Sequence, residues 1–401
     1  MTDMFKYLEN ENSAKIKVIG VGGAGGNAIN NMIDTGLQGV KFITANTDAQ
    51  ALEVAQAEMR IQLGAQITEG LGAGANPQVG RDSALENAEM IKESLADSHM
   101  VFITAGFGGG TGTGAAPVIA KLCKEMGILT VAVVTKPFSF EGRKRAKQAE
   151  EGIVELKKCA DTVITIPNDR LRGLASKNAK MVDMFKRADE ILLHSVKGIT
   201  DLIMMPGLVN LDFADVKTTM SRAGMAIMGI GISKGENRAL EAAERAISHP
   251  LLEDINISGA KGVLMNITSN SDLTMEEMTE ASERIYNEVG DDAEIIWGAV
   301  IDDELGEEMS VTVIATGIGE EDHASVREVI PQKMDPTYGG KVRDITPADL
   351  ARSSELDEPT FIRRRQTAGE RPANEIYREY KGIVIDNDDL DVPTFLRRKA
   401  D

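Results

Sequence analysis

Two glycine-rich segments of the sequence have the residue types and spacing to bind phosphate. The first spans residues 20–27, contains five glycines, and comes directly after an apolar run and before the helix-like stretch AINNMI. Glycine lets the backbone approach a phosphate closely, and the free N–H groups at a helix N-terminus then face the anion. This segment alone is a weak signal, because a tight turn between a strand and a helix also needs glycine.

The second glycine-rich segment is more specific. The apolar run at 100–105 is followed by GFGGGTGTG at 106–114, and Ala115, Ala116 and Pro117 open the next helix-like stretch. The threonine hydroxyls of this segment can donate hydrogen bonds to phosphate oxygens. Two such loops predict a ligand with several phosphates. Neither loop is a P-loop, since the Gly-Lys-Ser/Thr signature of that loop occurs nowhere in the chain.

The first glycine segment also fits a dinucleotide-binding enzyme. Gly20, Gly22 and Gly25 satisfy the G-x-G-x-x-G fingerprint. A nicotinamide or flavin enzyme needs no second glycine loop of this kind, however, and the acidic residue expected about 20 positions further on is poorly placed, because Asp48 comes late. A scaffold that binds nucleotide only to fold, without hydrolysing it, is a further alternative.

A third group of chemically active side chains lies far from both loops in the sequence. Asn210, Asp212 and Asp215 follow a helix break at Pro206 and Gly207. If the segment is helical, the two carboxylates share one face, where they can polarise a water molecule or bind a cation. The same spacing is also typical of a solvated helix N-terminus.

The elements that must position these residues follow from the apolar pattern. Between residues 16 and 166, short runs rich in Val and Ile alternate with helix-like stretches, which is typical of strands buried on both faces of a parallel sheet. These runs lie at 17–20, 41–45, 100–105, 129–134 and 162–166. This part is predicted to be a doubly wound α/β domain.

A long amphipathic helix and a second domain are predicted next. Apolar residues at helical spacing run from Met181 to Leu202, and the helix is expected to end at Met205, before the Pro-Gly break. Further strands are predicted at 225–232, 263–267, 295–301 and 311–318, together with two helices. They indicate a smaller α+β domain.

The composition excludes several classes of protein. With 42% hydrophobic and 27% charged residues, the chain can bury a core. The formal charge of −19 argues against a nucleic-acid binder, whose phosphate contacts need Lys and Arg. Cys123 and Cys159 are expected to be buried thiols, and neither they nor the histidines have metal-ligand spacing. No run reaches the roughly 18 apolar residues of a membrane span, so membrane contact is predicted to be indirect.

The last part of the chain is predicted to be a disordered linker that carries a repeated motif. Beyond Gly319 the apolar periodicity disappears, and six of the twelve prolines fall there. LDEPTFIRRR at 356–365 and LDVPTFLRRK at 390–399 match at seven of ten positions. Apolar anchors flanked by charge are typical of a short docking motif. The predicted docking residues are Leu356, Pro359, Phe361, Leu390, Pro393, Phe395, Leu396 and Arg397.

Taken together, the motifs resemble the tubulin/FtsZ family of GTPases. GGGTGTG is similar to the tubulin signature loop, and GVGGAGGNA, NTDAQAL, TKPFSFEGRKR and NLDFADV resemble segments of the bacterial cell-division branch, FtsZ. The resemblance covers about residues 12 to 318 plus the terminal peptide. The domains that it implies are a flexible N-terminus at 1–12, a parallel-sheet α/β GTP-binding domain at 13–180, a long central helix at 181–205, a smaller α+β C-terminal domain at 206–318, a disordered linker at 319–387 with the inner motif copy at 356–365, and a docking peptide at 388–401.

The resemblance also implies roles for residues at matching positions. The glycine loops would wrap the phosphates of GTP or GDP, Glu141 and Arg145 would hold the ribose, and three residues would read the guanine. A carboxylate at Asp189 can accept from guanine N1 and its exocyclic amine, which adenine cannot offer. Phe185 can stack on the base and fits a core position equally well. The implied GTP-binding residues are Gly22, Gly23, Ala24, Gly25, Gly26, Asn27, Gly108, Gly109, Gly110, Thr111, Gly112, Thr113, Gly114, Glu141, Arg145, Asn168, Phe185 and Asp189.

Assembly follows from the same resemblance. Asn210, Asp212 and Asp215 would enter the nucleotide pocket of the next subunit and act there as the catalytic residues, so hydrolysis would depend on head-to-tail self-assembly. The resemblance implies Mg²⁺ held by phosphates and water, with no metal ligand from the protein. The terminal peptide would bind an actin-like membrane tether and other division regulators, and the protein would be cytoplasmic, at the mid-cell division ring.

Overall fold

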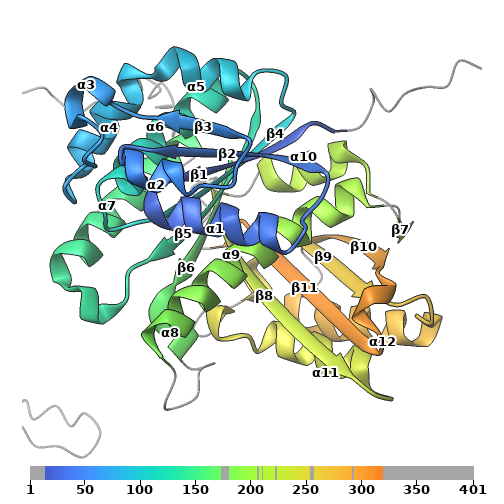
Figure 1. The fold of residues 1–401 in the computed structure, drawn as a ribbon. Coiled ribbons are helices and arrows are strands. Elements are labelled where there is room, and N and C mark those ends of the chain that lie inside the picture. Colours follow the sequence, from blue (N-terminus) through green and yellow to red (C-terminus); the bar gives the residue numbers. More distant parts are fainter. Residues whose placement is uncertain are drawn as a thin grey trace, which may run out of the picture. The chain divides into compact units, whose positions relative to one another are not determined.

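In the part of the chain that the structure describes, 11 strands form one sheet, around which the fold is built (Figure 1). The computed structural model describes residues 14–172, 180–205, 207–209, 211–221, 224–252, 257–290 and 293–318. The strands follow the order β3-β2-β1-β4-β5-β6-β8-β11-β9-β10-β7 across the sheet. They are β1 (Ile16–Val21), β2 (Val40–Asn46), β3 (Met59–Gln62), β4 (Met100–Gly106), β5 (Leu129–Lys136), β6 (Thr162–Pro167), β7 (Gly207–Val209), β8 (Gly224–Lys234), β9 (Gly262–Ser269), β10 (Glu294–Ile301) and β11 (Glu308–Thr316).

Helices cover both faces of the sheet. They are α1 (Gly22–Asp34), α2 (Ala49–Glu53), α3 (Ala65–Thr68), α4 (Pro77–Glu86), α5 (Ala88–Leu95), α6 (Thr111–Glu125), α7 (Arg143–Cys159), α8 (Asn168–Leu171), α9 (Met181–Met204), α10 (Phe213–Ser221), α11 (Arg238–Ile247) and α12 (Met275–Val289). None of these described helices is long and apolar enough to span a membrane.

Alternation along the strands supplies two cores. In β1, Val18 enters the core shared with α1, α9 and α10, whereas Ile19 enters the core shared with α5, α6 and α7. Because side chains of a strand point alternately to opposite faces, a strand that is apolar at both positions must be covered twice. A third core packs α11 and α12 against β8, β9 and β11.

All strand pairs from β3 to β8 are parallel. Their carboxyl ends therefore share one edge of the sheet, and their amino ends share the other. The first glycine segment connects β1 to α1, and the second connects β4 to α6. Both loops thus lie at the carboxyl edge, beside each other because β1 pairs with β4 along its whole length.

The central helix α9 holds the two halves of the sheet together. Its buried side chains share one core with Val133 of β5 on one side and with Leu264 of β9 and Ile314 of β11 on the other. The 24 residues of α9 correspond to about 36 Å of helix. Figure 1 shows α9 crossing between the two halves.

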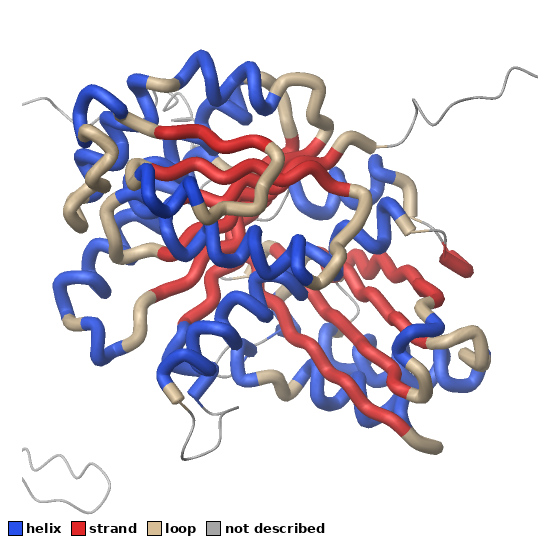
Figure 2. The backbone as a smooth tube through the Cα atoms, in the orientation of Figure 1, coloured by secondary structure: helices blue, strands red, loops and turns tan. Residues whose placement is uncertain are grey.

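The predicted fold class is confirmed, with one feature that the apolar pattern did not reveal. The sheet continues from the first half into the second, because β6 pairs with β8 in parallel register from Thr162↔Gly224 to Ile164↔Ala226 (Figure 2). An unpaired β6 edge would leave backbone N–H and C=O groups without partners. All nine predicted strands are present, and β3 and β7 were missed because they have only four and three residues.

Candidate functional site

The two glycine segments contact each other at the carboxyl edge of the parallel strands. Gly22 has a φ of +74°, and a Cβ built on it would lie 3.0 Å from the backbone nitrogen of Gly112. In the described part of the chain, neither the start of α1 nor that of α6 has a side-chain cap, and neither first turn contains an acidic residue. Two helix N-termini with free N–H groups therefore meet in one place, which favours an anion.

The glycines of these loops differ in what surrounds them. A Cβ added at Gly23 or Gly109 would meet no atom within 4 Å, so the backbone there borders open space. A Cβ at Gly25 would lie 2.5 Å from the carbonyl oxygen of Thr104, and one at Gly114 would overlap the carbonyl oxygen of Pro77 in α4. Gly23 and Gly109 thus leave room for a ligand, whereas Gly25 and Gly114 allow close packing within the protein.

Both threonines of the second loop bind protein groups. The Thr111 hydroxyl lies 2.7 Å from the Thr47 hydroxyl, and the Thr113 hydroxyl accepts the N–H of Gly108 at 2.9 Å. The sequence suggested that these hydroxyls donate to phosphate. Thr113 is buried and closes the loop, while Thr111 lies at the start of α6 and is held in place by the buried Thr47.

A third glycine-rich loop, which sequence analysis missed, packs against the second. Gly70, Gly72 and Gly74 all have positive φ angles, and a Cβ on Gly110 would lie 2.7 Å from the Cβ of Ala73. The loop ends where the Asn76 side chain accepts the Gln78 N–H and caps α4. Three glycines at alternate positions were the signal that could have found it.

The two residues predicted to hold the ribose bind each other. Arg145 Nη1 lies 2.5 Å from Glu141 Oε2, and Glu141 Oε1 accepts the backbone N–H of Phe138 at 2.9 Å. A Cβ on Gly108 would lie 2.9 Å from the Arg145 carbonyl oxygen, so this pair borders the second glycine loop. The side chain of Glu141 is largely buried, whereas that of Arg145 is half exposed.

The three residues predicted to read guanine come from α8 and α9. Asn168 is buried, and its Oδ1 has no hydrogen-bond partner among the described residues. The ring of Phe185 is 43% exposed and meets Phe138 edge-on at 5.5 Å, so it is placed in part on the surface and in part against another aromatic ring. Burial raises the pKa of the half-buried Asp189 to about 7, with a smaller contribution from Glu190.

These features fit the chemistry of a guanine site. An unpaired buried amide oxygen and a partly desolvated carboxylate are both costly in the empty protein, and a ligand that donates hydrogen bonds would relieve each cost. The half-exposed Phe185 ring offers a stacking surface. Ser139 donates its backbone N–H to Asp169 at 3.1 Å, which ties the segment next to Glu141 to the start of α8. The residues at the carboxyl ends of β5 and β6 are thus connected.

Asp212 and Asp215 lie at the opposite edge of the sheet. Both side chains are exposed at the start of α10. The other end of this helix is attached to the first residue of β6, because the Thr162 hydroxyl donates to the carbonyl oxygen of Met220. The ring of Phe213 lies 6.0 Å from that of His99, which directly precedes β4. The structure therefore does not bring the Asp pair to the glycine loops of the same chain.

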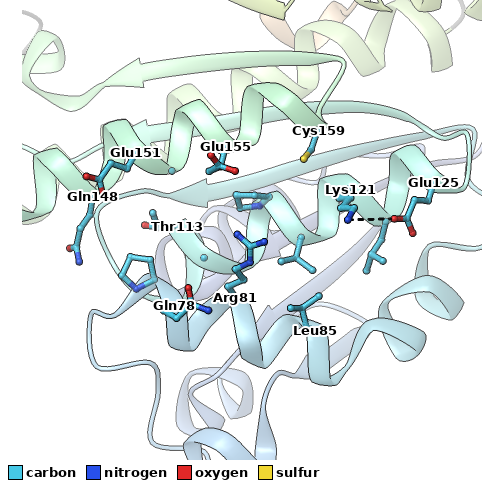
Figure 3. Close-up of a pocket in the computed structure, with 16 residues that line it drawn as sticks. Gln78, Arg81, Leu85, Thr113, Lys121, Glu125, Gln148, Glu151, Glu155 and Cys159 are labelled. Atoms are coloured by element: carbon cyan, nitrogen blue, oxygen red, sulfur yellow. Dashed lines mark ion pairs between the residues drawn. The ribbon is translucent and has the colours of Figure 1, made fainter.

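A separate groove of about 280 Å³ lies between α4, α6 and α7. Figure 3 shows Arg81, Lys121 and Glu155 projecting into it from the three helices. The groove shares only Thr113 and Gly114 with the predicted GTP-binding residues. Its carboxylates pair with lysines of their own helices, for example Glu155 with Lys158 at 2.5 Å, so the groove is not part of the candidate site. Cys159, expected to be buried, lies half-buried at its edge.

Within the described residues, no group of three or more His, Cys, Asp and Glu side chains is placed to hold a metal ion. Asn210 and the eight predicted docking residues lie outside the described part of the chain. Their roles therefore stay predictions.

Two parts of the chain match known protein families, and the whole chain is similar to individual known proteins. Residues 15–176 match the GTPase domain of the Tubulin/FtsZ family, and residues 224–319 match the C-terminal domain of the FtsZ family. The cell division protein FtsZ of Pseudomonas putida is 48% identical over 405 residues, which cover 99% of this chain and all of that protein, and the Pseudomonas aeruginosa protein is equally similar over 403 residues. The chain belongs to the FtsZ family.

Solved structures agree with this family. An FtsZ dimer from M. jannaschii is 47% identical, covers 78% of this chain and 90% of its own, and superposes with a TM-score of 0.74. CetZ2 from Haloferax volcanii, at 20% identity and a TM-score of 0.65, shares the fold. The FtsZ-family GTPase domain contains both glycine loops together with Glu141, Arg145 and Asn168, whereas Phe185 and Asp189 follow it on α9. Asp212 and Asp215 lie between the two matched domains.

Proposed function

We propose that the protein is a GTPase that assembles into head-to-tail filaments and hydrolyses GTP at the contact between two subunits. One observation carries the proposal: the glycine loops and the Asp212 and Asp215 pair lie at opposite edges of the parallel strands. A strand of six residues such as β1 spans about 20 Å. The carboxylates are therefore too far from the glycine loops of their own subunit, and a head-to-tail neighbour would supply them.

In this proposal the residues at the carboxyl edge bind the nucleotide. Backbone N–H groups at the starts of α1 and α6 contact the phosphates, with Gly23 and Gly109 leaving room for them. Glu141 and Arg145 exchange part of their mutual ion pair for the ribose. Asn168 and Asp189 accept hydrogen bonds from guanine donors. Adenine does not offer the pair of donors, N1–H and the neighbouring exocyclic amine, that the Asp189 carboxylate would accept from guanine. Guanine selectivity thus rests on two acceptors, Asn168 Oδ1 and the Asp189 carboxylate, which make no hydrogen bond to the described residues.

The Asp pair completes the site from the second subunit. Asp212 and Asp215 orient and polarise the water that attacks the γ-phosphate, and Asn210 contributes beside them. Mg²⁺, held by phosphate oxygens and water, would neutralise phosphate charge. Because phosphoryl transfer depends mainly on positioning and charge stabilisation, a nucleotide site without the neighbouring carboxylates should be nearly inactive.

The names of the relatives support this assembly and its cellular role. One solved relative is described as a dimer, and the Pseudomonas relatives are named cell division proteins. We infer that this protein forms the filaments of a cytoskeletal ring at the bacterial division site, in the cytoplasm. Contacts between two unlike surfaces that do not close produce filaments.

The repeated tail motif is proposed to connect the filament to its partners. Residues 390–399 would bind an actin-like membrane tether and other division regulators, so membrane contact stays indirect. The copy at 356–365 would bind the same partners, and two weak sites on one chain would raise the effective concentration of the second binding event. Deleting 356–365 should weaken binding to a membrane-clustered partner, and equal binding would exclude avidity.

The deciding experiment records phosphate release and light scattering together, with GTP and Mg²⁺, across a range of protein concentrations. A threshold concentration shared by both signals would support a site built from two subunits. Hydrolysis per subunit that stays constant down to nanomolar protein would refute it, because separate subunits would then be active.

A scaffold that binds GTP without turnover is tested by Asp212→Ala. We expect this variant to retain GTP binding and assembly and to lose phosphate release. If the wild-type protein binds GTP, assembles and releases no phosphate above background, the scaffold is the better description.

A further inference from the structure

The segment that carries the two carboxylates is fixed to the amino edge of the sheet. Leu211 and Phe213 pack on the core beneath α1 and α9, whereas Asp212 and Asp215 are exposed. Apolar and acidic residues therefore point to opposite sides at the start of α10. Val216, fully buried one turn further on, continues the same apolar side. The position of the carboxylates consequently depends on how firmly Leu211 and Phe213 are held.

His99 contacts this segment from the first half of the sheet. Its backbone N–H donates to the Lys15 carbonyl oxygen at 2.9 Å, and the Lys15 N–H donates to His99 Nδ1 at 2.9 Å. The imidazole is thereby held at the entry to β1 and β4. Its ring centroid lies 6.0 Å from that of Phe213, with the planes at 52°. Since Nδ1 accepts a hydrogen bond, the neutral ring carries its proton on Nε2.

We propose that His99 is a positioning residue for Asp212 and Asp215. Its ring supports Phe213 and so sets the angle at which the segment presents both carboxylates. The inference rests on the proposed function, in which those carboxylates act on the nucleotide of the next subunit. Displacing a catalytic group by about 1 Å can cost a hundredfold in rate, so a support outside the reacting atoms is enough to matter.

The ring and the Nδ1 acceptor of His99 can be separated by substitution. His99→Phe keeps a ring beside Phe213 and loses the acceptor, His99→Asn keeps an acceptor and loses the ring, and His99→Ala loses both. The readouts are kcat per subunit far above the assembly threshold, the threshold itself, and GTP affinity. We expect His99→Ala and His99→Asn to lower kcat by about threefold to tenfold, with threshold and affinity unchanged, and His99→Phe to stay within about twofold of wild type.

Two results would overturn the inference. His99→Ala at the wild-type kcat would show that the core alone positions the segment. A rise in threshold that accounts for the whole rate loss would show a structural effect on assembly. His99 is exposed, so folding of these variants is expected to be normal and is checked by the melting temperature.

A double-substitution cycle tests whether His99 acts through Phe213. Phe213→Leu keeps an apolar side chain in the core and removes the aromatic partner. In that background His99→Ala should lower kcat by less than about twofold, and fully additive losses would contradict the proposed route. The assembly threshold of the wild-type protein separates the two proposals. If the wild-type protein shows no threshold, the proposed site shared between two subunits is wrong. If it shows a threshold and His99→Ala has the wild-type kcat, only the proposed role of His99 is wrong.

Discussion

Asp189 illustrates how a residue that is costly for the fold would serve the ligand in the proposed function. Burial raises its pKa to about 7 from an ordinary 3.8. The folded chain therefore holds a proton that the unfolded chain releases, so this group's contribution to stability falls as pH rises from about 4 to 7 and stays low above that range. Guanine, which donates to the ionised form, would offset part of this cost.

The first prediction concerns the pH dependence of GTP binding. Because only ionised Asp189 accepts both guanine donors, GTP affinity should fall roughly tenfold between pH 8 and pH 6. Asp189→Asn should bind GTP weakly with a flatter profile, and at pH 8 should increase the free energy of unfolding by on the order of 1–2 kcal/mol, a gain that disappears toward pH 4. Calorimetric titration and thermal melts at matched pH measure both effects. Parallel profiles for the two proteins would show that another group titrates.

The second prediction concerns the open space at Gly23. A Cβ there meets no atom within 4 Å, and residue 23 lies in the first turn of α1. Gly23→Ala should leave thermal stability unchanged or raise it slightly, because alanine favours a helix by up to about 1 kcal/mol. The added methyl group would occupy the space proposed for a phosphate. GTP binding should therefore weaken by roughly tenfold or more, the cost of a lost phosphate hydrogen bond. Gly259→Ala, also in open space but just before β9 and outside the glycine loops of the candidate site, is the control. Unchanged affinity in Gly23→Ala would place the phosphates elsewhere.

At the scale of elements, the sequence revealed what is periodic and missed what depends on contact between distant segments. The strands other than β3 and β7, together with α9, were predicted because apolar spacing is local. The continuation of the sheet from β6 to β8 was not predicted, because the residues of β8, MAIMGIGI, do not indicate which strand they pair with. The role of two glycines in β8 is also apparent only from the structure. A Cβ on Gly229 or Gly231 would overlap carbonyl oxygens of α11, so both glycines allow α11 to pack closely against β8.

The candidate site shows the same division. The glycine loops and the pair Asp212 and Asp215 were recognisable by residue type and spacing, whereas the residues predicted to bind ribose and guanine were indicated by the family resemblance alone. The supports were not: Thr47 reaches Thr111 across 64 residues, and His99 reaches Phe213 from another half of the sheet. The sequence also did not show that Gly109 borders open space while Gly114 packs against α4, because this difference depends on how closely the backbone of α4 approaches the loop.

The third prediction uses that difference between glycines at the contact of α4 and α6. Gly114→Ala should lower the free energy of unfolding by about 1–3 kcal/mol. The new methyl group would overlap the Pro77 carbonyl oxygen and lie 2.6 Å from the backbone nitrogen of Arg81. Gly109→Ala in the same loop should leave stability unchanged and weaken nucleotide binding. Denaturant unfolding of both variants without nucleotide makes the comparison. Equal destabilisation would mean that the loop as a whole, not the helix contact, is sensitive.

At the scale of the whole molecule, the important property is that the two edges of the parallel sheet differ. A parallel sheet places its glycine loops at one edge, and the connection after α9 leaves the carboxylates at the other. In the proposed assembly, each subunit would carry two unlike surfaces that complement each other between molecules. Contacts of this kind that do not close produce filaments, so the same feature that separates the glycine loops from the carboxylates would also generate the filament.

The last prediction distinguishes a shared site from one within a single subunit. Asp212→Ala keeps the nucleotide loops but lacks a working Asp segment, whereas Asp189→Ala keeps the Asp segment but binds GTP poorly. Each should be nearly inactive alone. Mixed in equal amounts, they should recover at most about a quarter of the wild-type rate, the share of random contacts that pair an intact nucleotide site with an intact Asp segment. Phosphate release, recorded with light scattering to show that contacts form, measures this recovery.

A second mixture controls for recovery through assembly alone. It combines Asp212→Ala with an Asp189→Ala, Asp212→Ala double variant and therefore contains no intact Asp segment. Activity restored only in the first mixture requires that two chains share one site, and a mixture that scatters light but stays inactive would confine the chemistry to single subunits.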